Sequence, residues 1–141
     1  MARGVRRSSV RDHALEAEAV TASVEDDGCG AVVTFLGVVR NHDRGRPVVA
    51  IQYEGHPSAP EVLREVAEEV AGAHPGCCVA IEHRVGMLEV GEVAMVAAVS
   101  AAHRSEAFMT ASELVDLVKD RLPVWKRQVF ADGTDEWTGA A

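Results

Sequence analysis

The 141-residue sequence contains no long apolar run. Its longest apolar stretches, such as residues 93–99, are far shorter than the ~20 residues that a membrane-spanning helix requires. A transmembrane protein is therefore excluded. Internal repeats, low-complexity tracts and Pro/Ser-rich linkers are missing too, so nothing in the sequence divides the chain. Because a chain of this length removes about two thirds of its unfolded surface from water, it can build a core without metal or disulfide staples.

Cysteine and metal-binding patterns are also scarce. The three cysteines are Cys29, Cys77 and Cys78, and the adjacent pair lacks the C-x-x-C spacing of redox and zinc sites. The six histidines form no H-x-x-x-H or H-x-H pair that could gather a metal ion. We therefore predict reduced thiols, a cytoplasmic location and no metal centre.

Acidic residues outnumber basic ones, 22 to 14, which gives a formal net charge of −8. The basic residues are concentrated in residues 1–11, 37–46 and 104–127. The first segment is rich in arginine and has no acid, which is typical of an organelle transit peptide. It is short and lacks an apolar face, however, and no hydrophobic region of a signal peptide follows it. We predict a flexible basic N-terminus over residues 1–12 and a single domain over residues 13–141. The other two segments favour a small anionic ligand, because the acidic remainder of the surface would repel a long nucleic acid.

Hydrophobic patterning predicts helices interleaved with pairs of strands. Helices are expected over residues 14–26, 59–73 and 105–122, and strands over residues 31–39, 48–53, 78–84, 93–101 and 124–130. The first two strands are expected to form a hairpin with an arginine-rich tip, RNHDRGRP. The last helix carries a predicted core stripe of Phe108, Ala111, Val115, Val118 and Leu122, and Pro123 ends it. Hairpins in place of regular β-α-β units predict an α+β fold with a mostly antiparallel sheet and helices packed on one face.

The His103-Arg104 pair follows a predicted strand and opens the last helix. An imidazole, a guanidinium and the unpaired N–H groups of the helix start then lie together, which favours binding of an anionic group. The alternative is that His103 caps the helix and Arg104 is solvated.

Lys119 and Lys126 flank the helix stop at Pro123. Strand alternation points Trp125 and Lys126 to opposite faces, so that Lys126 can face the helix end that carries Lys119. Neighbouring cations lower the pKa of a lysine, and a lysine that titrates near neutrality can exchange a proton or attack an acyl carbon. The alternative is a snorkelling Lys119 and a solvated Lys-Arg edge at residues 126–127.

Residues 35–42 run from a strand into the predicted hairpin tip. Gly37 in mid-strand permits a bulge or a close backbone approach, and Arg40 stands where the chain leaves the sheet. The alternative is an ordinary edge hairpin.

Several motifs occur together and in order. They are GAVVTFLGVVRNH at residues 30–42, Tyr53-Glu54, HRVGMLEVGE at 83–92, VSAAHRSEAF at 99–108, the helix with Lys119, PVWKRQ at 123–128, and an ending with Asp132, Gly133 and Trp137. Over about residues 28–137 the sequence resembles the catalytic, large subunit of molybdopterin synthase. The resemblance implies a single hammerhead-like α+β domain of that family.

The resemblance also implies a sulfurtransferase of molybdenum-cofactor biosynthesis, which converts cyclic pyranopterin monophosphate to the dithiolene molybdopterin. The sulfur donor would be the C-terminal Gly-Gly thiocarboxylate of a ubiquitin-like small subunit, so no cofactor is expected. Pairing of the family's large subunits implies a homodimer within a heterotetramer. The functional positions that the resemblance implies are Lys119 and Lys126 as catalytic residues, and Phe35, Arg40, His103, Arg104 and Arg127 as substrate-binding residues.

Two other interpretations stay open. A non-catalytic module could bind a ubiquitin-like tail or a phosphorylated ligand through the same cations, and it would bind without turnover. A thiol enzyme built on Cys77-Cys78 is disfavoured, because no nearby cation in the sequence would lower the pKa of either thiol.

Overall fold

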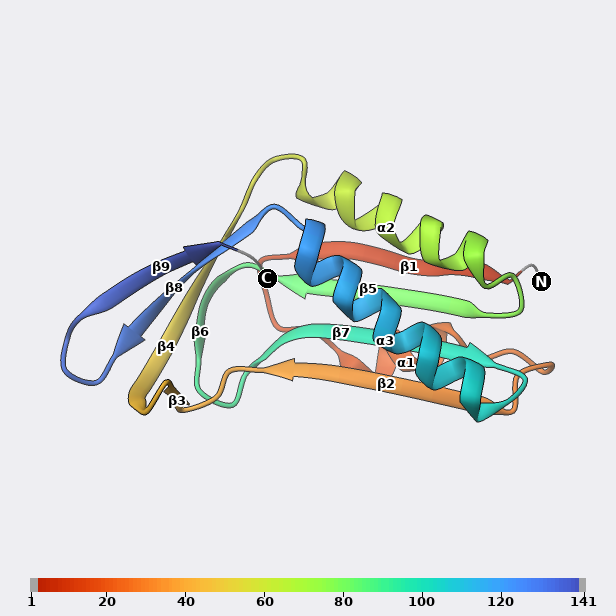
Figure 1. Cartoon of the computed structure of the whole chain (residues 1–141), viewed down its shortest axis with the longest axis horizontal. Coiled ribbons are helices and arrows are strands. Elements are labelled where there is room, and N and C mark those ends of the chain that lie inside the picture. The colour runs from red at the N-terminus through yellow and green to blue at the C-terminus, as the bar shows by residue number, and fades with distance from the viewer. Residues whose placement is uncertain (1–2, 140–141) are drawn as a thin grey trace.

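The computed structural model describes residues 3–139, which fold into three helices and nine strands (Figure 1). In chain order the elements are β1 (Gly4–Arg11), α1 (Ala17–Ser23), β2 (Ala31–Val38), β3 (His42–Asp43), β4 (Arg46–Gly55), α2 (Ala59–Ala73), β5 (Cys78–Arg84), β6 (Gly86–Glu89), β7 (Val93–Ala101), α3 (Arg104–Arg121), β8 (Val124–Phe130) and β9 (Asp135–Gly139). The predicted α+β class is confirmed. Residues 1, 2, 140 and 141, which belong to the predicted terminus and the predicted domain, lie outside the described residues.

The first sheet has the strand order β1-β5-β7-β2 and is antiparallel except for the β1–β5 pair. Its two central strands are buried along almost their whole length, because helices cover both faces of the sheet. Val79 and Ile81 face the main core, which includes the buried sides of α2 and α3. Cys78 and Ala80 face the opposite way and pack in a smaller core with α1. The two long helices thus share one face, as predicted, but the prediction that all helices pack on one face is wrong for the short α1, which covers the other (Figure 1).

The second sheet has the order β3-β4-β8-β9, with β6 paired to β4, and all its pairs are antiparallel. Figure 1 shows that it lies beyond one end of the first sheet. The predicted strand over residues 124–130 is confirmed as β8. The residues after it include a further strand, β9, which the hydrophobic pattern did not predict and whose Trp137 is paired with Arg127.

The predicted hairpin of residues 31–39 and 48–53 is wrong, because the two strands belong to different sheets. β2 pairs with β7, from Ala31 opposite Ala101 onward, whereas β4 pairs with β8 and β6. Both strands find partners far along the chain, which local pattern cannot reveal. A tight hairpin does occur within the predicted tip, where β3 pairs with the start of β4. Arg44 and Gly45 have φ values of 52° and 78°, as the type I′ turn of a two-residue hairpin requires.

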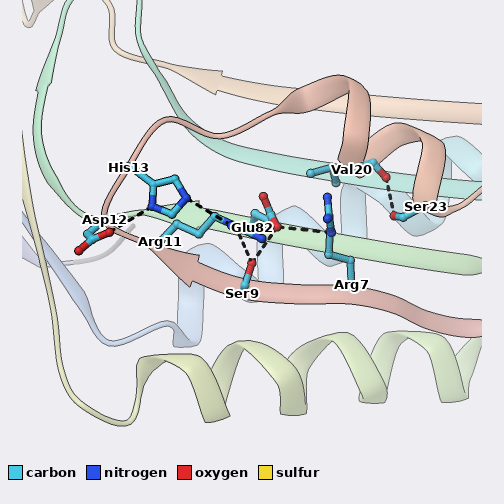
Figure 2. A network of polar contacts seen from close by, with 8 residues as sticks. All are labelled: Arg7, Ser9, Arg11, Asp12, His13, Val20, Ser23 and Glu82. Atoms are coloured by element: carbon cyan, nitrogen blue, oxygen red, sulfur yellow. Dashed lines mark hydrogen bonds and ion pairs between the residues drawn. The ribbon is translucent and has the colours of Figure 1, made fainter.

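The predicted flexible N-terminus is also wrong, because residues 4–11 form β1 and pair in parallel with β5. The physical reason is Glu82 on β5, a carboxylate that is 1% exposed and needs compensating cations. Ser9 Oγ donates to it at 2.8 Å, and the Nε atoms of Arg11 and Arg7 lie 3.0 and 3.6 Å from Glu82 Oε2 (Figure 2). We call Arg7, Ser9, Arg11 and Glu82 the arginine network.

The three helices differ in how well they match the sequence pattern. α2 has the predicted bounds, and α1 is shorter than the predicted helix over residues 14–26. α3 buries Ala107, Thr110, Ala111, Leu114, Val115 and Val118, and Leu122 after it is buried too, whereas Phe108 is 62% exposed. The prediction that Phe108 belongs to the core stripe is therefore wrong. No helix within residues 3–139 is sufficiently long and apolar to cross a membrane.

Candidate active site

A cavity of about 280 Å³ lies where the two sheets meet. The first sheet contributes residues of β2, β5 and β7, the second sheet contributes residues of β4 and β8, and α3 contributes one residue near its end. The polar and aromatic side chains in its lining include Phe35, Arg40, Tyr53, His83, Lys119, Lys126 and Gln128. Four of the seven predicted site residues, Phe35, Arg40, Lys119 and Lys126, are therefore brought together in one place.

Both lysines of the sequence line this cavity. Lys119 is exposed near the end of α3, and Lys126 is half-buried on β8. Partial burial lowers the pKa of Lys126, and the positive charge of Lys119 lowers it further. The negative charge of Asp43 raises this pKa, and the positive charge of Arg40 lowers it. A lysine whose pKa is lowered exchanges a proton more readily near neutral pH. Burial is thus the main cause of the lowered pKa of Lys126, and the neighbouring cations act on this pKa in the expected direction.

The chain around Pro123 sets the position of both lysines. α3 ends at Arg121, and β8 starts at Val124, which is buried in the main core. Trp125 then points outward at 44% exposure, and Lys126 lies opposite Tyr53 of β4. The alternation predicted for these two side chains is confirmed, and it turns Lys126 toward the cavity.

The other side of the cavity is built by β2 and the segment after it. The β2–β7 register shifts between Gly37 and Val38, so the predicted irregularity at Gly37 is confirmed. Arg40 follows the strand, and its Nη2 donates to Asp43 Oδ1 at 3.1 Å. The Arg40 side chain is 67% exposed, so this ion pair is weak and the guanidinium can turn to a ligand at low cost.

The sequence matches the family model of the MoaE protein over residues 10–121. This chain belongs to the MoaE family. It is 37% identical over 125 residues to the molybdopterin synthase catalytic subunit of Nostoc sp., covering 87% of this chain and 76% of that relative. The resemblance drawn from the motifs is confirmed.

Solved structures agree with the MoaE assignment. The crystal structure of molybdopterin synthase from Staphylococcus aureus matches with a TM-score of 0.86 and 28% identity, covering 92% of this chain and 95% of that chain. A chain from the complex of subunits 1 and 2 of the Helicobacter pylori molybdopterin-converting factor matches with a TM-score of 0.70 and 15% identity, covering 92% and 88%. The second likeness concerns the fold alone.

Two of the substrate-binding residues implied by the MoaE resemblance lie far from the cavity of their own chain. His103 is the residue before α3, without a side-chain capping bond, and Arg104 is the first residue of the helix; both are exposed. At about 1.5 Å per residue, roughly 22 Å of helix separates Arg104 from Lys119. One copy of the chain therefore does not gather His103, Arg104 and Arg40 into one anion site.

Arg127 also points away from the cavity, on the opposite face of β8 from Lys126. Its Nε and Nη2 donate to Gln52 Oε1 at 3.0 and 2.8 Å, and its Nη1 donates to Asp135 Oδ2 at 2.8 Å. The guanidinium carbon lies 6.0 Å from the ring centroid of Trp137. These contacts link β4, β8 and β9, and the structure does not bring Arg127 to the other site residues.

Four polar or aromatic residues of the cavity lining were not identified as site residues from the sequence: His42, Tyr53, His83 and Gln128. The rings of Tyr53 and His83 meet edge to face, with centroids 5.2 Å apart. His83 belongs to the motif HRVGMLEVGE, and its place two residues after Ile81 puts it on the strand face that packs into the main core. That spacing is a signal that could have located it.

Cysteine chemistry finds no support in the described residues. Cys77 is buried, with its Sγ 3.5 Å from Glu106 Oε1 and 3.6 Å from Thr110 Oγ1. Burial raises the pKa of the Cys77 thiol, which keeps it in the poorly nucleophilic protonated form. Within residues 3–139, no three His, Cys, Asp or Glu side chains are grouped to hold a metal ion. That the reaction needs no cofactor stays a prediction.

Proposed function

We propose that this MoaE family member transfers sulfur from the thiocarboxylate of a ubiquitin-like small subunit to cyclic pyranopterin monophosphate, giving the dithiolene molybdopterin. The observation that carries the proposal is the convergence of Phe35, Arg40, Lys119 and Lys126 on one cavity, in a chain similar to molybdopterin synthase catalytic subunits. We also propose that the chain works in the cytoplasm, where its three free cysteines would stay reduced.

The cavity supports a division of labour among its cations. The Arg40 guanidinium would hold an anionic oxygen of the precursor, and its partly exposed ion pair with Asp43 can rearrange to do so. Lys119 and Lys126 would polarise the thiocarboxylate, and Lys126, with its lowered pKa, would move a proton as the sulfur attacks. Each transfer forms a carbon–sulfur bond on the precursor side chain and breaks a carbon–oxygen bond there, whose oxygen leaves on the phosphate or as water. The carbon–sulfur bond of the tail breaks in the same transfer, and water supplies the new oxygen of the carboxylate that is left.

The proposed partner fits the size of the cavity. A tail that ends in Gly-Gly has no side chains at its last two residues, so it can enter a space of about 280 Å³ beside the lysines. The fold is compatible with such a partner, because a chain of this fold occurs in the two-subunit Helicobacter pylori complex. Extending the tail by one bulky residue should preserve much of the docking and remove turnover.

The position of His103 and Arg104 bears on the proposed assembly. Because both lie about 22 Å along α3 from Lys119, they can bind the substrate of this cavity if a second copy of the chain supplies them. We therefore propose a homodimer, within a heterotetramer that holds two small subunits, whose sites each combine residues of both large subunits.

Mixed variants test this assembly. Lys119→Ala and Arg104→Ala should each be inactive alone, and a mixture refolded together should regain about a quarter of wild-type turnover, because half of the random dimers carry one intact site. A mixture as inactive as its components would contradict the shared site, and an Arg104→Ala variant that is active alone would remove Arg104 from the mechanism.

The function itself is tested by incubating the purified chain with a thiocarboxylated small subunit and the cyclic precursor, and by measuring dithiolene formation. We expect product to appear and the thiocarboxylate to be consumed. If the chain binds the small subunit or the precursor without turnover, the non-catalytic module becomes the better account.

A further inference from the structure

His83 is a buried imidazole in the cavity wall with no role in the functional scheme described above. It lies at the end of β5, is 1% exposed and lines the cavity together with Lys119 and Lys126. Its Nδ1 lies 2.8 Å from the carbonyl oxygen of Arg84. Because a carbonyl oxygen only accepts, Nδ1 carries the proton and donates it. The other ring nitrogen, Nε2, is then a hydrogen-bond acceptor.

The surroundings of His83 hold the ring in place and keep it uncharged. Tyr53 of β4 packs against it edge to face, at an interplanar angle of 78°. Burial lowers the pKa of His83 to about 4; the hydrogen bond to the Arg84 carbonyl opposes this, and the positive charge of Lys119 on α3 adds to it. Nε2 therefore stays an acceptor at neutral pH, in an orientation fixed by the neighbours of the ring.

The cavity is rich in donors and poor in fixed acceptors. Arg40, Lys119 and Lys126 can donate hydrogen bonds but cannot accept them while they are charged. The Tyr53 hydroxyl can donate or accept by rotating, and the Gln128 side chain offers both kinds of atom. Two imidazoles line the cavity: His42, which is exposed and whose Nδ1 lies 2.9 Å from Asn41 Oδ1, and His83. His83 is the buried one, and the acceptor role of its Nε2 is set before any ligand arrives.

A pterin needs such an acceptor. Its ring and amino N–H groups are donors that lose their water partners when the heterocycle enters a closed site, and a donor left without a partner there weakens binding. Cations at the cavity can satisfy phosphate and carbonyl oxygens, but they repel the positive edge of an N–H group.

We infer that His83 Nε2 accepts a hydrogen bond from an N–H group of the pterin and so sets the orientation of the heterocycle while the cations hold its anionic end. This inference rests on the proposed function, since it takes the cyclic precursor as the ligand. His83 is then a substrate-binding residue that distinguishes donor-bearing heterocycles from other phosphorylated compounds.

Two substitutions separate this role from a structural one. The amide of His83→Asn reaches the place of Nδ1 and can still donate to the Arg84 carbonyl, but it leaves the place of Nε2 empty. The longer side chain of His83→Gln can put an amide oxygen near the place of Nε2. For sulfur transfer by the full complex, we expect the KM for the precursor to rise about 10- to 100-fold in His83→Asn and to change less than about threefold in His83→Gln.

The control is His13→Asn, an exposed histidine beside the arginine network, which should leave KM at the wild-type value. A structural role would give the reverse order, with His83→Asn tolerated and His83→Gln impaired. That order, or equal KM values in all variants, overturns the inference while the proposed function stands. A wild-type complex that makes no dithiolene overturns the proposed function, and the inference falls with it.

A measurement on the unaltered protein covers the case in which a variant fails to fold. With ¹⁵N-labelled histidine, the Nε2 signal of His83 should have the shift of an unprotonated ring nitrogen at neutral pH and should move when the cyclic precursor is added. A signal that stays in place at saturating precursor rejects the hydrogen bond.

Discussion

The arginine network and the cavity are two clusters of positive charge that are built in opposite ways. In the arginine network, Arg7 and Arg11 converge on the buried carboxylate of Glu82, so the charges are paired (Figure 2). In the cavity, Arg40, Lys119 and Lys126 share one space, and the positive charges of Lys119 and Arg40 act to lower the pKa of Lys126. The arginine network holds β1 on the sheet, whereas the cations at the cavity, among them Arg40 in its exposed ion pair with Asp43, are placed to meet an anionic ligand. Substitutions should therefore affect stability in the first cluster and turnover in the second.

The largest expected effect is at Lys119. Lys119→Ala should reduce sulfur transfer by about 10²- to 10⁴-fold, because it removes a charge beside the reacting groups. Lys119→Arg should fail too, since a guanidinium does not release its proton at neutral pH. Dithiolene formation measures both, and circular dichroism should show an unchanged fold. Arg64→Ala on α2, which removes an exposed ion pair with Glu68, is the matched control. Normal turnover in Lys119→Ala would remove the residue from the mechanism.

The second prediction concerns the arginine network. The double variant Arg7→Ala/Arg11→Ala leaves Glu82 buried without its cations and should destabilise the fold by about 3–5 kcal/mol. Glu82→Gln should cost less, because the two arginine side chains are 33% and 35% exposed and can reach water. Urea denaturation measures the free energy of unfolding. Turnover per folded molecule should stay at the wild-type level in both variants, and a double variant as stable as the wild type would contradict this account of β1.

The third prediction is a loss of stability in mild acid that originates in the cavity. Folding lowers the pKa of His83 from 6.5 to about 4, so between these values the unfolded chain binds more protons than the native one. The stabilisation is therefore present above about pH 6.5 and is lost as the pH falls toward 4; from about pH 7 to about pH 5 the loss is roughly 2 kcal/mol. Urea denaturation of wild type and His83→Gln at both pH values isolates this loss. An equal pH dependence in the two proteins would refute it.

The smallest expected effect is on the titration of Lys126. The sequence has two lysines, so ¹³C labelling of lysine gives two side-chain signals that can be followed with pH. The pKa of Lys126 should rise slightly in Arg40→Ala, which removes a neighbouring cation, and fall slightly in Asp43→Asn, which removes the opposing carboxylate. Arg121→Ala, whose guanidinium is paired with Glu69, is the control and should leave the signal in place. Shifts of the opposite sign would show that the gathered charges do not set this pKa.

Strong local patterns allowed much of the fold to be predicted from the sequence. The strands β5, β7 and β8 and the helix α2 have their predicted bounds. β7 is an almost continuous apolar run, β5 starts with one, β8 is bounded by apolar residues, and α2 is a regular amphipathic repeat. The pairing of the strands could not be predicted from such local patterns. β1 was missed because its arginines resemble a solvated tail until Glu82 is known to lie beside them, and β2 and β4 were paired wrongly because their true partners lie far along the chain.

The site shows the same limit. Lys126 was placed correctly from strand alternation and the helix stop at Pro123, both of which are local features. His83 was missed as a site residue, because its importance depends on where Tyr53 and Lys119 lie relative to the end of β5. The distance between Arg104 and Lys119 follows from the length of the helix alone. It shows that two residues which the family resemblance implies for one site lie far apart within one chain.

The parallel pairing of β1 with β5 has a consequence for the order of folding during synthesis. β1 leaves the ribosome first, yet its partner spans residues 78–84, so its backbone donors and acceptors wait without a partner until more than half of the chain is made. The same delay applies to β2, which pairs with β7 at residues 93–101. Such long-range pairing slows folding, and unpaired strand edges attract other chains in the meantime. The arginines of β1, which later compensate a buried carboxylate, meanwhile keep this edge charged and discourage such association.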